Sequence, residues 1–225
     1  MSRVAIVAAL EREVRPLVKG WHRNEREHEG RKFRFFEKGD AVLVCGGIGS
    51  EAARRAAEAV IALYEPRVVY SAGFAGALES GMKVGDVVLP KRVIDTSDGS
   101  SVSLESGSGV LVSFGSVASP EQKAKLKESF GAQLVDMEAA AVARAAQARG
   151  VRFETVKAIS DERDFTFPEL GRFVNGQGQF LEGRFAVYTA VRPWLWGKVA
   201  RLARSSARAS NVLCEWLRAS LSSGR

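Results

Sequence analysis

Short apolar segments alternate with helix-forming segments along most of this chain, and no other sequence feature constrains its fold as strongly. Residues 4–9 and 68–72 are apolar runs of the kind that form strands buried on both faces. Residues 50–64, 120–129 and 138–149 have the composition of helices. Strands that alternate with helices predict an α/β fold, with a largely parallel sheet covered by helices on both faces.

Turn and loop signals complete the expected arrangement. Residues 33–37 and 41–45 flank Gly39, which predicts a hairpin with its turn at that glycine. Residues 21–32 are polar and charged and predict a surface connection, whereas residues 95–109 are rich in serine and glycine and predict an exposed loop. Further strands are expected at residues 85–94, 111–114, 134–136 and 153–160.

Several of the predicted strands end in polar or glycine-rich patches. In a parallel sheet, ligands bind beyond the carboxyl ends of the strands, so such patches are expected to converge. The patches are Glu11-Arg12-Glu13, Gly46-Gly47, residues 73–76, Asp136-Met137-Glu138 and Ser160-Asp161. The sequence therefore predicts one ligand site built from segments that lie far apart along the chain.

Length and composition fit a single globular domain over residues 1–225, with 46% hydrophobic and 26% charged residues. Cys45 and Cys214 are too far apart for a metal knuckle or a redox pair, so we expect free thiols in a reducing compartment. The apolar run at residues 4–10 is too short to span a bilayer and lacks a signal-peptide cleavage site. These features predict a cytoplasmic location.

The net charge of +7 is concentrated at one end of the chain. Residues 192–225 contain seven basic residues and one acidic residue, so the rest of the chain is close to neutral. A nucleic-acid-binding domain carries its basic residues within a recognisable module, and none is present, so we expect no nucleic-acid partner.

Histidine and cysteine chemistry has little support in this sequence. His22 and His28 are the only histidines and both lie in the polar segment, outside any zinc-binding motif. The chain also lacks the GxSxG motif of serine hydrolases. The sequence therefore disfavours zinc hydrolysis and Ser-His-Asp catalysis, and we expect neither a metal nor another cofactor.

Residues 47–52 match the GxGxxA fingerprint of dinucleotide-binding folds, between a predicted strand and a helix for which Ser50 is the expected N-cap. That fold requires an acidic residue at the end of the next strand to hold the ribose. Here the next strand ends in Tyr70-Ser71-Ala72-Gly73, which contains no carboxylate. The motif therefore favours a tight strand-to-helix turn over a dinucleotide site.

Two acidic segments allow both a structural and a chemical interpretation. Asp136 and Glu138 precede a helix, where carboxylates are favoured by the helix dipole, but a carboxylate there can also bind a sugar hydroxyl pair over the apolar Met137. Asp161 follows a buried strand, where it is either a helix cap or surface acid, or a general acid in a partly desolvated pocket.

Five stretches of the chain resemble the purine nucleoside phosphorylase superfamily, most closely its methylthioadenosine/adenosylhomocysteine nucleosidase branch. They are VAIVAALEREV at residues 4–14, CGGIGSEAA from Cys45, SAGFAGAL from Ser71, VGDVVL from Val84, and VDMEAAAVA followed by VKAISDERD. The matches occur in the family's order and span residues 3–164. The resemblance implies a three-layer α/β/α fold with a mixed, largely parallel sheet, a small-molecule purine nucleoside as substrate, and a homo-oligomer.

The resemblance also assigns roles to individual residues. Glu13 matches the acid that orients and activates the attacking water, and Asp161 matches the acid that protonates the leaving purine. Glu138 matches the carboxylate that binds the ribose hydroxyls, and Met137 the residue beneath the sugar. The substrate-binding positions implied in this way are Met137, Glu138, Ser160 beside Asp161, and the strand-end residues Gly73 and Phe74.

Water is favoured over phosphate as the nucleophile. The phosphorylases of this superfamily bind phosphate through arginines in two motifs, and the matching positions here are Glu13 and Ser71. A carboxylate where a phosphate-binding cation belongs repels phosphate. Arg12 or Arg15 would restore phosphate binding, so a phosphate-dependent phosphorylase remains the alternative. A second alternative is a catalytically silent, membrane-associated protein that binds nucleosides.

The sequence departs from the nucleosidase pattern in three places. Phe74 replaces a small residue, Asp136 replaces a glutamate, and residues 95–136 form a shortened segment, so the lid over the 5′ substituent is reduced. The tail, residues 192–225, predicts a basic amphipathic helix with an apolar stripe that either packs on the domain or contacts a membrane. The stripe consists of Leu195, Val199, Leu202, Leu213, Trp216 and Leu217. Tail and lid together resemble the hopanoid-associated branch, which implies adenosylhopane as substrate and peripheral contact with the inner membrane face.

Overall fold

A computed structural model describes residues 3–165, 170–175 and 178–223 of the chain. Its strands are β1 (Val4–Ala8), β2 (His22–His28), β3 (Arg31–Lys38), β4 (Ala41–Cys45), β5 (Val68–Ala77), β6 (Val87–Val88), β7 (Arg92–Asp95), β8 (Ser101–Ser103), β9 (Val110–Ser113), β10 (Leu134–Asp136) and β11 (Arg152–Asp161). Its helices are α1 (Glu11–Val18), α2 (Ser50–Tyr64), α3 (Pro120–Phe130), α4 (Ala139–Gln147), η1 (Leu170–Phe173), α5 (Glu182–Ala190), η2 (Pro193–Leu195) and α6 (Trp196–Ser222).

The strands form one mixed sheet in the order β2-β3-β4-β1-β5-β10-β9-β7-β8, with β11 pairing with β5 and β6. At its centre β1 runs parallel to β4 and β5, and β5 runs parallel to β11. The far end of β5 leaves β1 and pairs antiparallel with β10. This branch brings the ends of β1, β5, β10 and β11 together at one edge, where the sequence places its acidic patches.

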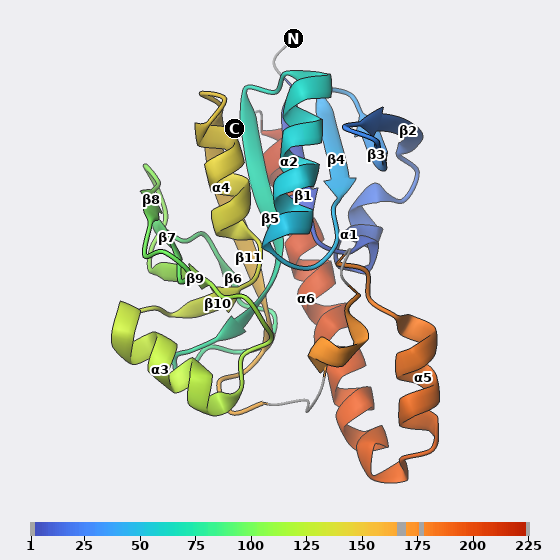
Figure 1. Cartoon of the computed structure of the whole chain (residues 1–225), viewed down its shortest axis with the longest axis vertical. Helices are drawn as coiled ribbons and strands as arrows, with labels where there is room; N and C mark the ends of the chain where they lie inside the picture. Colours follow the sequence, from blue (N-terminus) through green and yellow to red (C-terminus); the bar gives the residue numbers. More distant parts are fainter. Residues whose placement is uncertain (1–2, 166–169, 176–177, 224–225) are drawn as a thin grey trace.

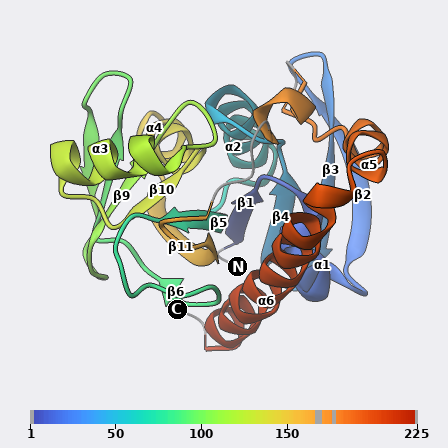
Figure 2. The same ribbon diagram turned by 90° about the horizontal axis from the view of Figure 1, so that it is seen from below.

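Helices cover both faces of the sheet, as Figures 1 and 2 show. The alanine-rich helices α2 and α4 pack on one face, where small side chains allow close approach to the strands. Helices α1 and α6 pack on the other face through residues such as Leu17, Leu213 and Leu217. Helix α3 closes a third cluster beside β9 and β10. The prediction of a three-layer α/β/α fold is confirmed.

Four local predictions were wrong. Residues 21–32 contain strand β2, which pairs with β3 at the edge of the sheet. Residues 95–109 contain β8, which pairs antiparallel with β7. The segment at residues 85–94 is divided into β6 and β7 around Pro90, which has no amide hydrogen for a ladder bond. Strand β5 extends to Ala77, because its glycines are paired with β11.

The start of α2 also differs from expectation. Ser50 is the first helical residue, and the capping position belongs to Gly49 with φ of 96°. This left-handed backbone conformation is readily accessible to glycine and is unfavourable for residues with a β-carbon. The glycine thereby turns the chain sharply from β4 into α2 and directs its amide hydrogen away from the helix.

Helix α6 has two different halves. Its C-terminal half is buried against α1 and β11 through Ala209, Ser210, Leu213 and Cys214, whereas its N-terminal half projects with α5 beyond the sheet (Figure 1). The C-terminal half thus follows the interpretation in which the tail packs on the domain. Among the described residues, no helix combines the length and the apolar character needed to cross a bilayer.

Candidate active site

A cavity of about 190 Å³ lies where the ends of β1, β5, β10 and β11 meet. Glu13, Glu138 and Asp161, which are separated by long stretches of sequence, all line it. Met137, Phe74 and Ser160 line it as well, so six of the predicted site residues share this space. Gly73 lies directly behind the wall, because a β-carbon on it would come within 2.8 Å of Glu13 Oε2.

Glu13 is buried in the first turn of α1, with only 6% of its surface exposed. Burial raises the pKa of Glu13 to about 8, and the nearby charge of Glu138 adds to the shift, whereas Lys157 and Arg12 oppose it. Its Oε2 atom is buried and has no hydrogen-bond partner among the described residues. A buried carboxylate oxygen without a donor is unfavourable, so this atom is available to a ligand or a water molecule in the cavity.

Glu138 occupies the position before the first residue of α4. Its carboxylate accepts hydrogen bonds from the Gly49 amide at 2.8 Å and from the Met137 amide at 3.2 Å. Burial raises the pKa of Glu138 to about 7, and the adjacent charge of Asp136 adds to the shift. The GxGxxA segment therefore serves this site through its backbone, because Gly49 orients the carboxylate.

The glycine that directly follows β4 is required by close packing. A β-carbon on Gly46 would lie 2.6 Å from the Ala56 β-carbon and 2.8 Å from the Ala52 carbonyl oxygen. No side chain fits at those distances without movement of the helix backbone. The structural interpretation of the motif, a tight strand-to-helix turn, accounts for this contact.

Asp136 faces inward to a buried lysine that sequence reasoning missed. Lys157 Nζ lies 2.8 Å from Asp136 Oδ2 and 3.1 Å from Ser71 Oγ, and both members of the ion pair are almost fully buried. Asp136 also accepts hydrogen bonds from the Ser113 hydroxyl and the Ala139 amide. The sequence does contain a signal for this residue, namely a lysine within a mostly apolar strand. A buried ammonium needs a buried partner, so a lysine in such a strand predicts an ion pair in the interior.

Asp161 ends β11 and is only partly exposed, so it is neither a helix cap nor a free surface acid. Its Oδ1 accepts a hydrogen bond of 2.7 Å from the Ser160 hydroxyl. Its Oδ2 contacts the ammonium of Lys123, which also donates to the Glu162 carbonyl oxygen at 2.9 Å. Lys123 is 2% exposed and was missed, because its neighbours Lys125 and Lys127 make the helix resemble a solvated charged face.

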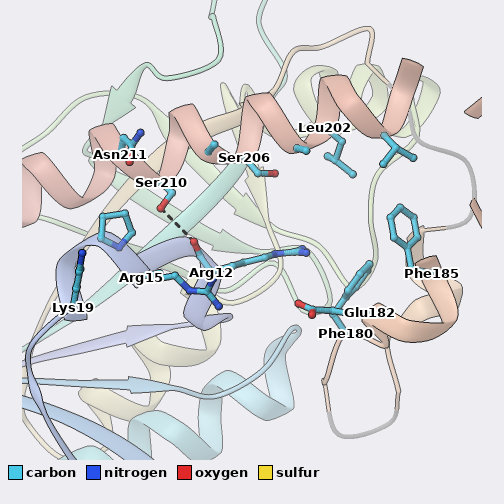
Figure 3. A pocket seen from close by; sticks show the side chains of 14 residues that line it. Arg12, Arg15, Lys19, Phe180, Glu182, Phe185, Leu202, Ser206, Ser210 and Asn211 are labelled. Atoms are coloured by element: carbon cyan, nitrogen blue, oxygen red, sulfur yellow. Dashed lines mark hydrogen bonds between the residues drawn. The ribbon is translucent and has the colours of Figure 1, made fainter. Parts of the chain in front are cut away.

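A second and larger cavity, shown in Figure 3, is called the apolar groove below. It has a volume of about 630 Å³ and lies between α1, α5 and α6. Arg12, Leu202 and Ser206 line both cavities, so the two spaces share a wall. Arg12 stacks over the Phe180 ring at 4.8 Å, and Phe185, Val199 and Leu202 line the apolar side.

Comparison with known proteins places the chain among nucleoside-processing enzymes. The model of the phosphorylase superfamily matches residues 3–113 and 104–176. The 5′-methylthioadenosine/S-adenosylhomocysteine nucleosidase of Actinobacillus succinogenes is 28% identical over 72% of this chain and 86% of its own length. The enzyme of the same name from Buchnera aphidicola is 39% identical, but the match spans only 25% of each chain.

Solved structures show the same fold. The methylthioadenosine nucleosidase of Helicobacter pylori, crystallised as a mutant with 5′-methylthioadenosine in its active site, aligns with a TM-score of 0.69 at 18% identity, covering 97% of this chain and 99% of that one. The futalosine hydrolase of Helicobacter pylori aligns with a TM-score of 0.65 at 20% identity, covering 94% and 95%. From the family match and the shared fold together, the chain belongs to the phosphorylase superfamily.

Proposed function

We propose that this protein cleaves the N-glycosidic bond of a purine nucleoside, with water as the nucleophile. The observation that carries the proposal is the meeting of Glu13, Glu138 and Asp161 in one cavity. The related enzymes named above are nucleosidases, which supports the same reaction class. The three acids have different surroundings, and this fits three different roles: a general base, a ligand of the sugar and a general acid.

Each acid has a defined task in the proposed reaction. Glu138 binds the ribose hydroxyls, with Met137 beneath the sugar. As the bond between C1′ and the purine nitrogen breaks, the sugar gains positive charge, which the nearby carboxylates stabilise. Glu13 takes a proton from a water held at its unpartnered oxygen while that water's oxygen bonds to C1′. Asp161 carries a proton in the reactive complex and transfers it to the departing base, which leaves neutral. The Asp161 carboxylate formed in this step is then stabilised by the Lys123 ammonium.

The nucleophile is tested by measuring base release in the presence and absence of inorganic phosphate. The expected result is release at the same rate in both, with free ribose derivative as the product. In their ionised forms, the buried carboxylates of Glu13 and Glu138 oppose entry of an anion. Arg12 and Lys123 are cations that line this cavity, and Arg12 is the one that would favour phosphate beside Glu13. Strict dependence on phosphate would establish the phosphorylase alternative, and no release in either case would establish the silent binding protein.

The substrate class follows from the apolar groove. We infer that the 5′ substituent is large and apolar, as in adenosylhopane, because the groove offers about 630 Å³ beside the catalytic cavity. The shortened segment between β7 and α3 leaves less chain to cover a small 5′ group than a full lid would. A methylthio group would fill only a small part of this volume, so it would gain little apolar contact there.

Filling the groove is expected to separate bulky from small substrates. Replacing Ala203 by tryptophan places a large ring among the groove residues of α6, outside the catalytic cavity. Overpacking of this kind costs roughly 1–3 kcal/mol, so kcat/KM for adenosylhopane should fall about five- to 150-fold. Cleavage of adenosine, which leaves the groove empty, should be unchanged.

Ala219→Trp is the matched control, since Ala219 is exposed on the same helix beyond the groove. It should leave the turnover of both substrates as in the wild type. Equal losses for adenosine and adenosylhopane in the Ala203 variant would contradict a role for the groove in substrate choice.

A further inference from the structure

Large apolar side chains are exposed at the end of the hairpin formed by α5, η2 and α6. We define the hairpin tip as Val187, Val191, Trp194 and Trp196, which are 69%, 66%, 73% and 58% exposed. Elsewhere in the described part of the chain, the only other large apolar side chain with comparable exposure is Val117, at 46%, beside the catalytic cavity. An exposed cluster of this kind marks an interaction site.

The hairpin tip is an ordered structure with its own internal contacts. Trp196 Nε1 donates to the Thr189 carbonyl oxygen at 3.1 Å, which ties the start of α6 to the end of α5. Leu195 and Thr189 are buried between the two helices. On the inner side, Phe173 packs edge-on against Phe185 and holds α5 toward the domain. The exposed tryptophans therefore project from a fixed scaffold.

The charge around the hairpin tip has one sign. Residues 183–200 contain three basic residues and no acidic residue. Arg184 and Lys198 are exposed next to the tip, and Arg192 stacks on the Tyr188 ring at 3.8 Å. Basic residues around exposed tryptophans are the arrangement that binds anionic lipid surfaces, where the indole rings lie at the level of the headgroups.

We propose that the hairpin tip docks on an anionic lipid bilayer. The partner is a membrane and not a second copy of this chain, because a two-fold contact between tips would bring like charges together. Only the projecting half of the tail takes part, since Leu213 and Leu217 of the predicted stripe are buried in the domain. This half also lines the apolar groove through Val199 and Leu202. If the proposed function holds, the tip delivers the groove to a lipid-linked substrate.

Vesicle sedimentation tests the docking without reference to catalysis. The full chain is mixed with vesicles of phosphatidylcholine alone, or of phosphatidylcholine with phosphatidylglycerol, at low and at high salt. We expect binding to the anionic vesicles at low salt and weak binding to the neutral ones. Removal of one basic residue near the surface weakens binding about fivefold, so Lys198→Glu, which changes the charge by two, should weaken it about 25-fold.

Two further variants separate the contribution of the tip from general charge and from misfolding. The double variant Trp194→Ser/Trp196→Ser should lose at least as much binding as Lys198→Glu, because it removes the apolar part of the contact. Lys125→Glu changes the same charge on an exposed position of α3 and should bind like the wild type. Circular dichroism melting curves establish that each variant is folded.

The proposal is overturned if the tip variants and the wild type bind anionic vesicles equally, or if Lys125→Glu is as impaired as Lys198→Glu. It is also overturned if the wild type does not bind anionic vesicles at low salt. If in addition the tryptophan variant converts an oligomer to a monomer, the tip is an interface between copies of the chain. Loss of vesicle binding with normal cleavage of adenosine supports docking and leaves the proposed function intact. Vesicle binding without any cleavage would refute the proposed function alone.

Discussion

Replacing Asp161 by asparagine is expected to lower the rate of purine release by about 10²–10⁴-fold, the usual contribution of a general acid. The asparagine has nearly the same shape and still accepts the hydrogen bond from Ser160, but it holds no proton for the leaving base. The loss should appear in kcat, with KM little changed, because proton transfer occurs in the transition state. Steady-state rates with adenosine and with the lipid-linked nucleoside measure it.

Lys123 complicates this variant, because asparagine leaves its buried ammonium without a carboxylate. An unpaired buried charge is destabilising, so a reduced rate could reflect partial unfolding. The double variant Asp161→Asn/Lys123→Met removes both charges and should remain folded yet inactive. Asp164→Asn, at an exposed position close by in the chain, should retain full activity. Near-normal rates in the folded double variant would remove Asp161 from the proposed mechanism.

The centre of the fold could be predicted from sequence because burial leaves a plain signal there. Strand β1 is apolar at every position and is buried along its whole length, and α2 was predicted over its observed residues, although its capping residue was not. The edges carry no such signal. Strand β2 is polar and mostly exposed, so it lacks the alternation that marks a half-buried strand. Its pairing with β3 depends on backbone hydrogen bonds, which sequence composition does not reveal.

The candidate site also contains residues that could be predicted from the sequence and residues that could not. Glu13, Glu138 and Asp161 were identified because each follows a strand or begins a helix, and because the motifs around them resemble one family. Lys123 and Lys157 were not identified from the sequence, because their partners are acids distant in sequence. Only the folded chain brings each lysine and its acid together. The apolar groove was also out of reach, because it forms between three helices whose packing the sequence does not specify.

The arrangement of the two lysines explains how one small cavity holds several acids. Lys157 pairs with Asp136 beneath the cavity and lies close enough to Glu13 and Glu138 to lower the pKa of both. Lys123 pairs with Asp161 on the side proposed for the base. The lysines thus compensate only part of the negative charge. Glu13 and Glu138 retain raised pKa values, which a base that works near neutral pH requires.

Replacing Glu13 by glutamine is expected to have two opposite effects. Activity should fall about 10²–10⁴-fold, because the amide cannot take a proton from water. In the wild type, kcat/KM should rise with pH and approach its plateau above about 8, the pKa to which burial raises Glu13, since only the ionised carboxylate acts as a base. The variant's residual activity should lack this rise. Glu11→Gln, on the same turn but partly exposed, should retain it.

The Glu13→Gln variant should lose activity but gain folding stability relative to the wild type as the pH rises. The pKa of Glu13 is about 8 in the folded chain against an ordinary value of 4.5, so the folded chain binds this proton more tightly than the unfolded chain. The contribution of Glu13 to stability is therefore greatest below pH 4.5, falls as the pH rises toward 8, and then levels off. Glutamine does not ionise and escapes this loss. Urea unfolding at about pH 5 and about pH 8.5 should show the variant gaining stability relative to the wild type at the higher pH. An equal difference at both pH values would contradict a buried, proton-binding carboxyl at this position.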